Sequence, residues 1–259
     1  MKTLSQKTLW DKNWEADTDV EKLINSRFTR EAYRLIAGSV TFKDRLMLEA
    51  GCGTGRLSNL LAREFGRSEV IGIDISENSI RMSNRLKKHL GLSNASFVLC
   101  DMFNMPFRDD SFDFVFNEGV IEHYGIECSP TYEDALKEMI RVAKRGGTIL
   151  AGVPNWFNFP HTLYKWMLKK RNKSFKYDYE KSFRHSELAE VFLKLGLGNL
   201  RIGAFYPAHG FYRLSGPENG RYDLMGRLTD NLQKLIDRHF DDYFSYRFGF
   251  EIMVKGEKA

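Results

Sequence analysis

Cysteine is scarce in this chain, and long apolar runs are absent. Three of the 259 residues are cysteine and no two of them form a CxxC pair, so neither a disulfide framework nor a metal site is expected. No stretch reaches the eighteen or so apolar residues of a membrane span. The polar residues 1–19 do not form the apolar core of a signal peptide. These absences predict a cytoplasmic protein.

Positive charge spread evenly along the chain is also absent. The chain has 39 Lys and Arg against 34 Asp and Glu, a formal net charge of +5. The excess lies in residues 165–184, which hold eight basic and two acidic side chains, whereas residues 1–153 are almost balanced. A nucleic-acid-binding protein usually carries a wider basic surface, so nucleic acid is not an expected partner.

The chain does have enough apolar residues for a core, 42% of the total, and they follow alternating patterns. Short apolar stretches predict strands near 45–50, 69–76, 95–101, 111–119, 146–155, 200–207 and 248–256. Helical spacing predicts helices near 18–38, 56–66, 76–90, 131–144, 186–196 and 222–240. The alternation predicts a doubly wound α/β fold, with a mostly parallel seven-stranded sheet, helices on both faces and an antiparallel edge strand.

The most informative motif is the glycine loop Glu49-Ala-Gly51-Cys-Gly53-Thr-Gly55, between a predicted strand and a predicted helix. Glycines allow a sharp turn and a close approach of the backbone to a ligand. The dinucleotide fingerprint GxGxxG would need its third glycine at Arg56, and no GK[ST] of a Walker A loop follows. The loop therefore differs from both of these nucleotide-binding motifs.

The loop resembles motif I of the class I S-adenosylmethionine-dependent methyltransferases, and three later motifs match in order across roughly residues 44–155. The resemblance implies a Rossmann-like methyltransferase fold. It also implies that Asp74 binds the ribose hydroxyls, that Asp101 and Met102 bind the adenine, and that residues 117–118 face the methionine end. The residues implied to bind S-adenosylmethionine are Glu49, Gly51, Cys52, Gly53, Gly55, Asp74, Ile75, Asp101, Met102, Asn117 and Glu118.

Within this superfamily the chain is most similar to the small-molecule branch, which includes the ubiquinone/menaquinone-biosynthesis type. The resemblance implies O- or N-methylation of a small molecule, with S-adenosylhomocysteine as product. The [DN]-P-P-[YF] motif of nucleobase N-methylases is absent after the fourth strand, where Asn117-Glu-Gly-Val stands instead. Two alternatives stay open: an RNA- or protein-directed methyltransferase that uses residues 165–184, or a cofactor-binding protein without activity.

A general base is needed only if the acceptor is a hydroxyl or a protonated amine. His123 follows the fourth predicted strand, close to the expected reaction end, and is the candidate catalytic residue. Its alternative role is structural, as a hydrogen-bonding residue of that loop. His161, His185 and His209 are weaker candidates.

A single methyltransferase domain, residues 1–259, is expected, with a cofactor-binding core at 44–155. Residues 1–40, with Trp10 and Trp14, are expected to form a helical lid or to pack on the sheet edge. Residues 155–185 form an insertion, and residues 186–259 supply a helix and the edge strands. The insertion could be a solvated cap, a pocket wall for an anionic or aromatic substrate, or a helix at an anionic membrane surface. The sequence indicates no oligomeric state.

Overall fold

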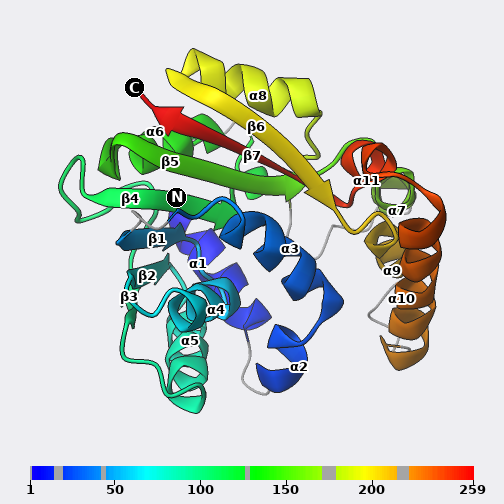
Figure 1. Ribbon diagram of the computed structural model, residues 1–259, viewed down its shortest axis with the longest axis horizontal. Helices are drawn as coiled ribbons and strands as arrows, with labels where there is room; N and C mark the ends of the chain where they lie inside the picture. Colours follow the sequence, from blue (N-terminus) through cyan, green and yellow to red (C-terminus); the bar gives the residue numbers. More distant parts are fainter. Residues whose placement is uncertain (1, 15–19, 42–44, 126–128, 171–178, 215–221) are drawn as a thin grey trace.

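The computed structural model describes residues 2–14, 20–41, 45–125, 129–170, 179–214 and 222–259. These residues form one seven-stranded sheet in the order β3-β2-β1-β4-β5-β7-β6, with helices on both sides (Figure 1). The predicted fold class is confirmed. No helix in these ranges combines the length and the apolar character needed to cross a membrane.

Five parallel strands build the first part of the sheet. They are β1 (Leu46–Ala50), β2 (Glu69–Asp74), β3 (Ala95–Leu99), β4 (Phe112–Glu118) and β5 (Ala143–Pro154). The connection from β1 leads to β2 on one side, and β4 pairs with β1 on the other. The order therefore reverses between β1 and β4, and open α/β sheets bind ligands at the carboxyl ends of the strands beside such a reversal.

Alternate residues of the strands pack into two separate hydrophobic cores, one on each face of the sheet. Leu48, Val115 and Ile149 pack on one face, where α6 (Tyr132–Val142) and α8 (His185–Lys194) contribute apolar side chains. Met47 and Phe116 point to the other face, against α3 (Arg27–Ala37) and α4 (Arg56–Glu64). Because successive strand residues face opposite sides, this register also decides the face on which each polar residue near a strand end lies.

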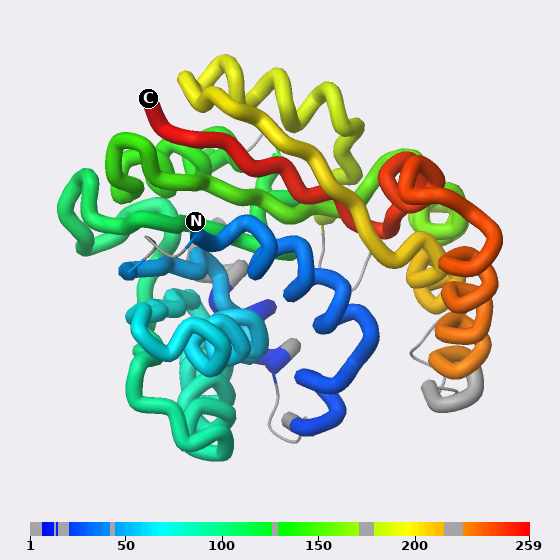
Figure 2. Tube along the Cα trace, viewed as in Figure 1, coloured from blue at the N-terminus to red at the C-terminus, as the bar shows by residue number. Residues whose placement is uncertain are grey.

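The last two strands pair with each other, but their order in the sheet is inverted relative to the sequence. β7 (Glu251–Lys258) runs antiparallel to β5, and β6 (Leu197–Phe205) pairs antiparallel with β7 at the edge. The antiparallel strand is thus next to the edge strand. Beyond the carboxyl end of β5 lie α7 (Phe159–Lys170), α9 (His209–Leu214), α10 (Tyr222–His239) and α11 (Asp242–Phe248), at the right of Figures 1 and 2.

The amino-terminal helices differ from the prediction in one respect. The single helix expected over 18–38 is two helices, α2 (Val20–Ile24) and α3, because Ser26 adopts an extended conformation and its hydroxyl accepts a hydrogen bond from the Thr29 N–H. Before them comes α1 (Lys2–Asn13), and α5 (Glu77–His89) follows β2. A short 3₁₀ turn, η1 (Ile121–His123), follows β4.

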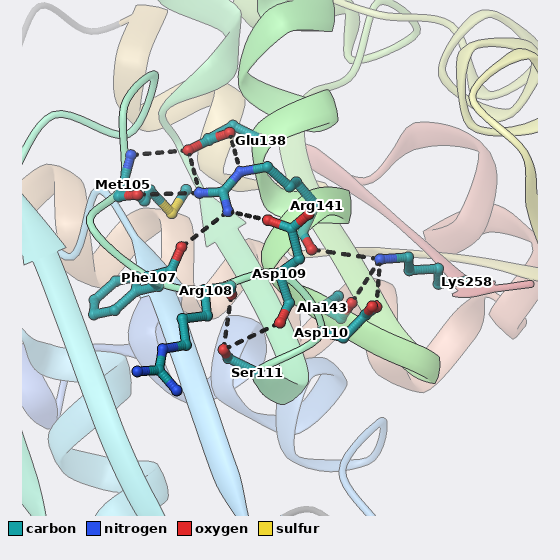
Figure 3. Close-up of polar contacts among 10 residues, drawn as sticks. All are labelled: Met105, Phe107, Arg108, Asp109, Asp110, Ser111, Glu138, Arg141, Ala143 and Lys258. Carbon is teal, nitrogen blue, oxygen red and sulfur yellow. Dashed lines mark hydrogen bonds and ion pairs between the residues drawn. The ribbon is translucent and has the colours of Figure 1, made fainter.

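A polar cluster fixes the long connection between β3 and β4 (Figure 3). All five N–H donors of Arg141 are used, on the Glu138 carboxylate, the Asp109 carboxylate and the carbonyls of Met105 and Phe107. Lys258, at the end of β7, bonds to Asp110 at 2.8 Å. The connection that leaves Asp101 and Met102 is therefore held at its far end by α6 and by β7.

Candidate functional site

One cavity opens at the carboxyl ends of β1, β2 and β4. It is lined by the glycine loop, by the ends of β2 and β4, and by the residues after β3. All the predicted cofactor-binding residues except Gly55 and Asn117 line it. The structure therefore brings together four motifs that lie up to about seventy residues apart in the sequence.

The loop backbone requires its glycines. Gly51, Gly53 and Gly55 have φ angles of 82°, 51° and 68°, a region that other L-residues rarely adopt. A Cβ at Gly51 would lie 2.6 Å from a Val120 methyl carbon, and one at Gly53 would lie 3.2 Å from the Trp14 ring. These two glycines keep the cavity floor open, whereas Gly55 starts α4 and packs against Ser83 without reaching the cavity.

Asp74, at the end of β2, is joined to the glycine loop. Its two carboxylate oxygens accept hydrogen bonds from the Gly53 N–H at 2.8 Å and the Ser76 N–H at 2.9 Å. Burial raises the pKa of Asp74, and these backbone bonds act against that rise. Hydrogen bonds from the Ser79 side chain and the Ile75 backbone lower the pKa in the same way, and the carboxylate lines the cavity.

Beside Asp74 the cavity wall is formed by the residues after β3. Asp101 and Met102 line it, together with Ile75 and Tyr124. One oxygen of Asp101 accepts from the Phe103 N–H at 3.0 Å, which fixes the carboxylate. Burial raises the pKa of the Tyr124 phenol, so the ring stays neutral. This wall combines a hydrogen-bond acceptor with apolar surfaces.

The opposite end of the glycine motif carries buried carboxyl groups. Glu49 accepts bonds from the N–H and hydroxyl of Ser58, at 3.0 and 2.5 Å, and so occupies the amino end of α4. Burial raises the pKa of Glu49 to about 8. Glu118, at the end of β4, forms an ion pair with Arg56, a cavity-lining residue that the sequence analysis did not select.

Asn117 does not reach the cavity. Its side chain is fully buried, and its amide lies 3.1 Å from the Met139 sulfur on the face covered by α6. Strand alternation places Asn117 and Glu118 on opposite faces, so only Glu118 is available to a ligand.

His123 lines the cavity at the end of η1. Its Nδ1 lies 2.7 Å from the Tyr179 carbonyl oxygen, and Trp10 packs edge-on against its ring at 5.0 Å. A carbonyl only accepts, so Nδ1 carries the hydrogen. Burial lowers the pKa of His123, which favours the neutral ring.

The other histidines lie outside the cavity lining. His161 bonds to Glu180 at 2.7 Å, and His185 lies 2.8 Å from the Tyr246 carbonyl. His209 packs between Phe28 and Phe250.

Sequence reasoning missed one end of the cavity. Glu122, Glu180, Arg213, Phe250 and Glu251 line it. They come from η1, the segment before α8, α9 and the start of β7, so no spacing in the sequence connects them. The one signal was Glu251 itself, a charged residue that opens the apolar run EIMV. In the part of the chain that the structure describes, no group of three or more His, Cys, Asp or Glu could hold a metal ion.

Known proteins resemble this chain in sequence and in fold. A family model described as a methyltransferase domain matches residues 42–193. The demethylmenaquinone methyltransferase of Bacillus velezensis is 31% identical over 175 residues, which cover 61% of this chain and 73% of the relative. That of Listeria welshimeri is 28% identical over 172 residues, 60% of this chain and 71% of the relative.

Solved structures show the same fold. An S-adenosylmethionine-dependent methyltransferase of Thermotoga maritima superposes with a TM-score of 0.62 at 18% identity, over 98% of this chain and all of the other. Phosphoethanolamine N-methyltransferase 2 of Haemonchus contortus, in complex with S-adenosylmethionine, superposes with a TM-score of 0.66 at 16% identity. The superposition covers 98% of this chain and 60% of the other.

The fold is doubly wound α/β, with its cavity at the carboxyl ends of the strands, where proteins of this class bind their ligands. The chain belongs to the methyltransferase domain family. It is an S-adenosylmethionine-dependent enzyme that methylates a small molecule.

Proposed function

We propose that the glycine loop and the strand ends would hold S-adenosylmethionine, and that the methyl acceptor would bind at the part of the cavity lined by His123. One observation carries this proposal: Gly53, Asp74, Asp101 and Glu118, from four separate motifs, line a single cavity. Asp74 accepts from the ribose hydroxyls and Asp101 accepts from the adenine amine, with Met102 against the ring. Glu118 would accept from the amino group of the methionine part, and Arg56 would donate to its carboxylate.

The cofactor supplies a methyl group on a positively charged sulfur, which needs no further activation. The residues of the chain must therefore place an acceptor in line with that methyl group and exclude water. His123 accepts a proton from the acceptor at Nε2, since its Nδ1–H donates to the Tyr179 carbonyl.

We propose that α1 is a lid over the bound cofactor. Trp10 and Trp14 line the cavity. Asp11 accepts from the Ser76 hydroxyl at 2.7 Å, and its carbonyl accepts from the Asn78 amide at 2.7 Å. These contacts attach α1 to the start of α5, next to Asp74.

The described part of the basic insertion supports the role of a pocket wall. Lys165 pairs with Glu180, Lys181 pairs with Glu187, and the backbone of Tyr179 positions His123. Two of the five described basic residues of this segment are thus paired within the protein, which favours a pocket wall over an RNA-binding surface. The basic residues at 171–176 lie outside the described residues.

A calorimetric titration with S-adenosylmethionine tests the cofactor assignment. Replacing Asp74 by Asn removes a charged acceptor and should weaken binding by about 10- to 100-fold. The matched control is Asp242→Asn, a change at an exposed carboxylate in α11. Unchanged affinity in a folded Asp74→Asn protein would contradict the ribose role, and absence of binding to the wild-type protein would contradict the site as a whole.

A further inference from the structure

Four buried glutamates meet at the end of the cavity that the sequence left unexplained. Glu118 and Glu251 lie on the same face of the sheet, at the end of β4 and the start of β7, and the intervening β5 has Gly152 beside Glu118. Glu122 belongs to η1 and Glu180 to the segment before α8. The side chains of Glu118, Glu122 and Glu180 are 3–6% exposed. Glu251 is 4% exposed as a whole residue.

Two of these carboxyl groups have a cation and two do not. Arg56 pairs with Glu118, and Lys165 lies 3.4 Å from Glu180. Burial raises the pKa of Glu180, but the bond from His161 and the charges of His161, Lys165 and Arg213 outweigh it and bring the pKa to about 2. In the described residues no Lys or Arg lies within ion-pair distance of Glu122 or Glu251.

Glu122 and Glu251 are also incompletely hydrogen-bonded. The Oε2 atom of each is buried and has no hydrogen-bond partner among the described residues. Burial raises the pKa of both groups well above the ordinary value, and neighbouring carboxylates raise it further, for Glu251 partly through a hydrogen bond shared with Glu118. Buried polar groups are nearly always satisfied in folded proteins, so two unsatisfied acceptors on one cavity wall point to a missing donor.

We propose that the methyl acceptor is a primary amine, whose ammonium group is bound by Glu122 and Glu251. This inference rests on the proposed function and names its substrate class. An ammonium offers three donors and a positive charge, which matches two acceptors in a cavity rich in carboxylates. A carboxylate or phosphate acceptor would instead add negative charge beside four glutamates.

The apolar part of the acceptor has a place beside these groups. Phe28 and Phe250 line the same cavity, with ring centroids 6.0 Å apart, and Trp10 lies against His123. Aromatic faces attract cations and pack against apolar bodies. The site therefore suits an amine with an alkyl or aryl body.

The reaction balances with the groups present. The bound ammonium gives one proton to Nε2 of His123. The freed nitrogen lone pair forms the N–C bond to the methyl carbon while the C–S bond breaks and its electrons stay on sulfur. The products are a secondary ammonium and S-adenosylhomocysteine, and the proton on His123 passes to solvent.

Matched probe sets test the charge preference directly. The protein is titrated, with and without S-adenosylhomocysteine, with phenethylamine, 2-phenylethanol and phenylacetate, and with butylamine, butanol and butyrate. The amine of at least one set should bind about tenfold more tightly than its alcohol, and the carboxylates should not bind. If neither amine binds better than its alcohol, or if a carboxylate binds best, the proposal is wrong. The titrations without cofactor keep this result separate from any failure of cofactor binding.

Variants test which ligand the two carboxyl groups serve. Glu122→Gln and Glu251→Gln should each weaken the amine about tenfold or more and leave the affinity for S-adenosylmethionine unchanged. Glu190→Gln, at an exposed position of α8, is the matched control. Loss of cofactor affinity in the two variants would assign these groups to the amino group of the methionine part and overturn the proposal.

A stability measurement distinguishes the loss of a ligand-binding group from poor folding of the variant. Glu251→Met removes the unsatisfied buried oxygen and should raise the Tm of the empty protein by roughly 2 to 4 °C while abolishing amine binding. A lower Tm would show that Glu251 stabilises the fold, and would contradict its role as a ligand group that is unsatisfied in the empty protein.

Discussion

At the scale of the residue, Glu49, Glu118 and Glu251 show how a strand register selects side chains for a site. Each occupies the face of the sheet on which Met47, Phe116 and Met253 build the core. An apolar residue at these strand ends would extend that core. A glutamate there brings a polar carboxyl group to the cavity, and its burial raises the pKa, to about 8 for Glu49.

His123 provides a prediction at the same scale. Replacing it by Gln should lower kcat about 100-fold and leave the affinity for S-adenosylmethionine unchanged, because the base acts only in the chemical step. A purely structural histidine would change cofactor affinity and stability together, and steady-state kinetics with calorimetry separate the two outcomes.

The same residue predicts a pH profile. Burial lowers the pKa of His123, so the neutral, proton-accepting form persists below pH 6.5, the ordinary histidine value. The midpoint of the acid limb in the pH profile of kcat should therefore lie below pH 6.5 for the wild-type enzyme. The His123→Gln enzyme should have no such limb. An acid limb that is identical in both enzymes would contradict the role as base.

At the scale of the element, helix α6 begins with a capping box formed by Thr131 and Asp134. The Thr131 side chain accepts from the Asp134 N–H, and the Asp134 carboxylate accepts from the Thr131 N–H at 3.0 Å. Hydrogen bonds lower the pKa of Asp134 to about 2. The largest effect comes from the backbone of Thr131, followed by the side chains of Lys137 and Thr131.

The cap therefore predicts a pH-dependent loss of stability. Asp134→Asn should destabilise the protein by about 0.5 to 1 kcal/mol at pH 7. Since the folded-state pKa is depressed, the contribution of the carboxylate is complete above its ordinary pKa of 3.8 and is lost as the pH falls toward 2. Urea unfolding at pH 7, 5 and 3 should show the two proteins converging. Asp242→Asn is the control, and a constant difference at all three values would contradict the argument.

Elements also show what the sequence could and could not predict. The five parallel strands and the glycine loop followed from apolar runs and glycine spacing, because these depend on local residues. The break at Ser26 was missed because the apolar spacing continues through it, and only the capping bond to Thr29 interrupts the helix. Asn117 was selected with Glu118 because adjacency in a motif does not reveal which face of the strand each residue occupies.

The acceptor end could not be predicted for a different reason. Glu122, Glu251 and Arg213 come from separate elements, and Arg213 and Glu251 lie beyond residues 42–193, where the family model matches. A motif records residues that approach a shared cofactor, whereas the acceptor wall depends on contacts made only in the folded chain.

At the scale of the whole molecule, α1 connects the amino terminus to the cofactor site. Trp14 packs over Gly53, and Lys7 pairs with Glu77 at 2.8 Å. Trp14→Ala should accelerate dissociation of S-adenosylmethionine by about tenfold, with little change in the association rate, because the lid acts on the bound state. Stopped-flow displacement measures both rates. Equal dissociation rates in wild-type and variant proteins would show that α1 does not act as a lid.

The position of β7 between β5 and β6 has a consequence for how the enzyme is made and how it can diversify. β6 has no partner in the described sheet except β7. Residues 197–205 can therefore pair with the sheet only after residues 251–258 have been synthesised. The cofactor half is complete long before that moment. Glu251, the member of the proposed acceptor site on β7, is therefore among the last cavity residues to be synthesised. A substitution at Glu251 would thus change the proposed acceptor site without altering the motif residues between 49 and 118.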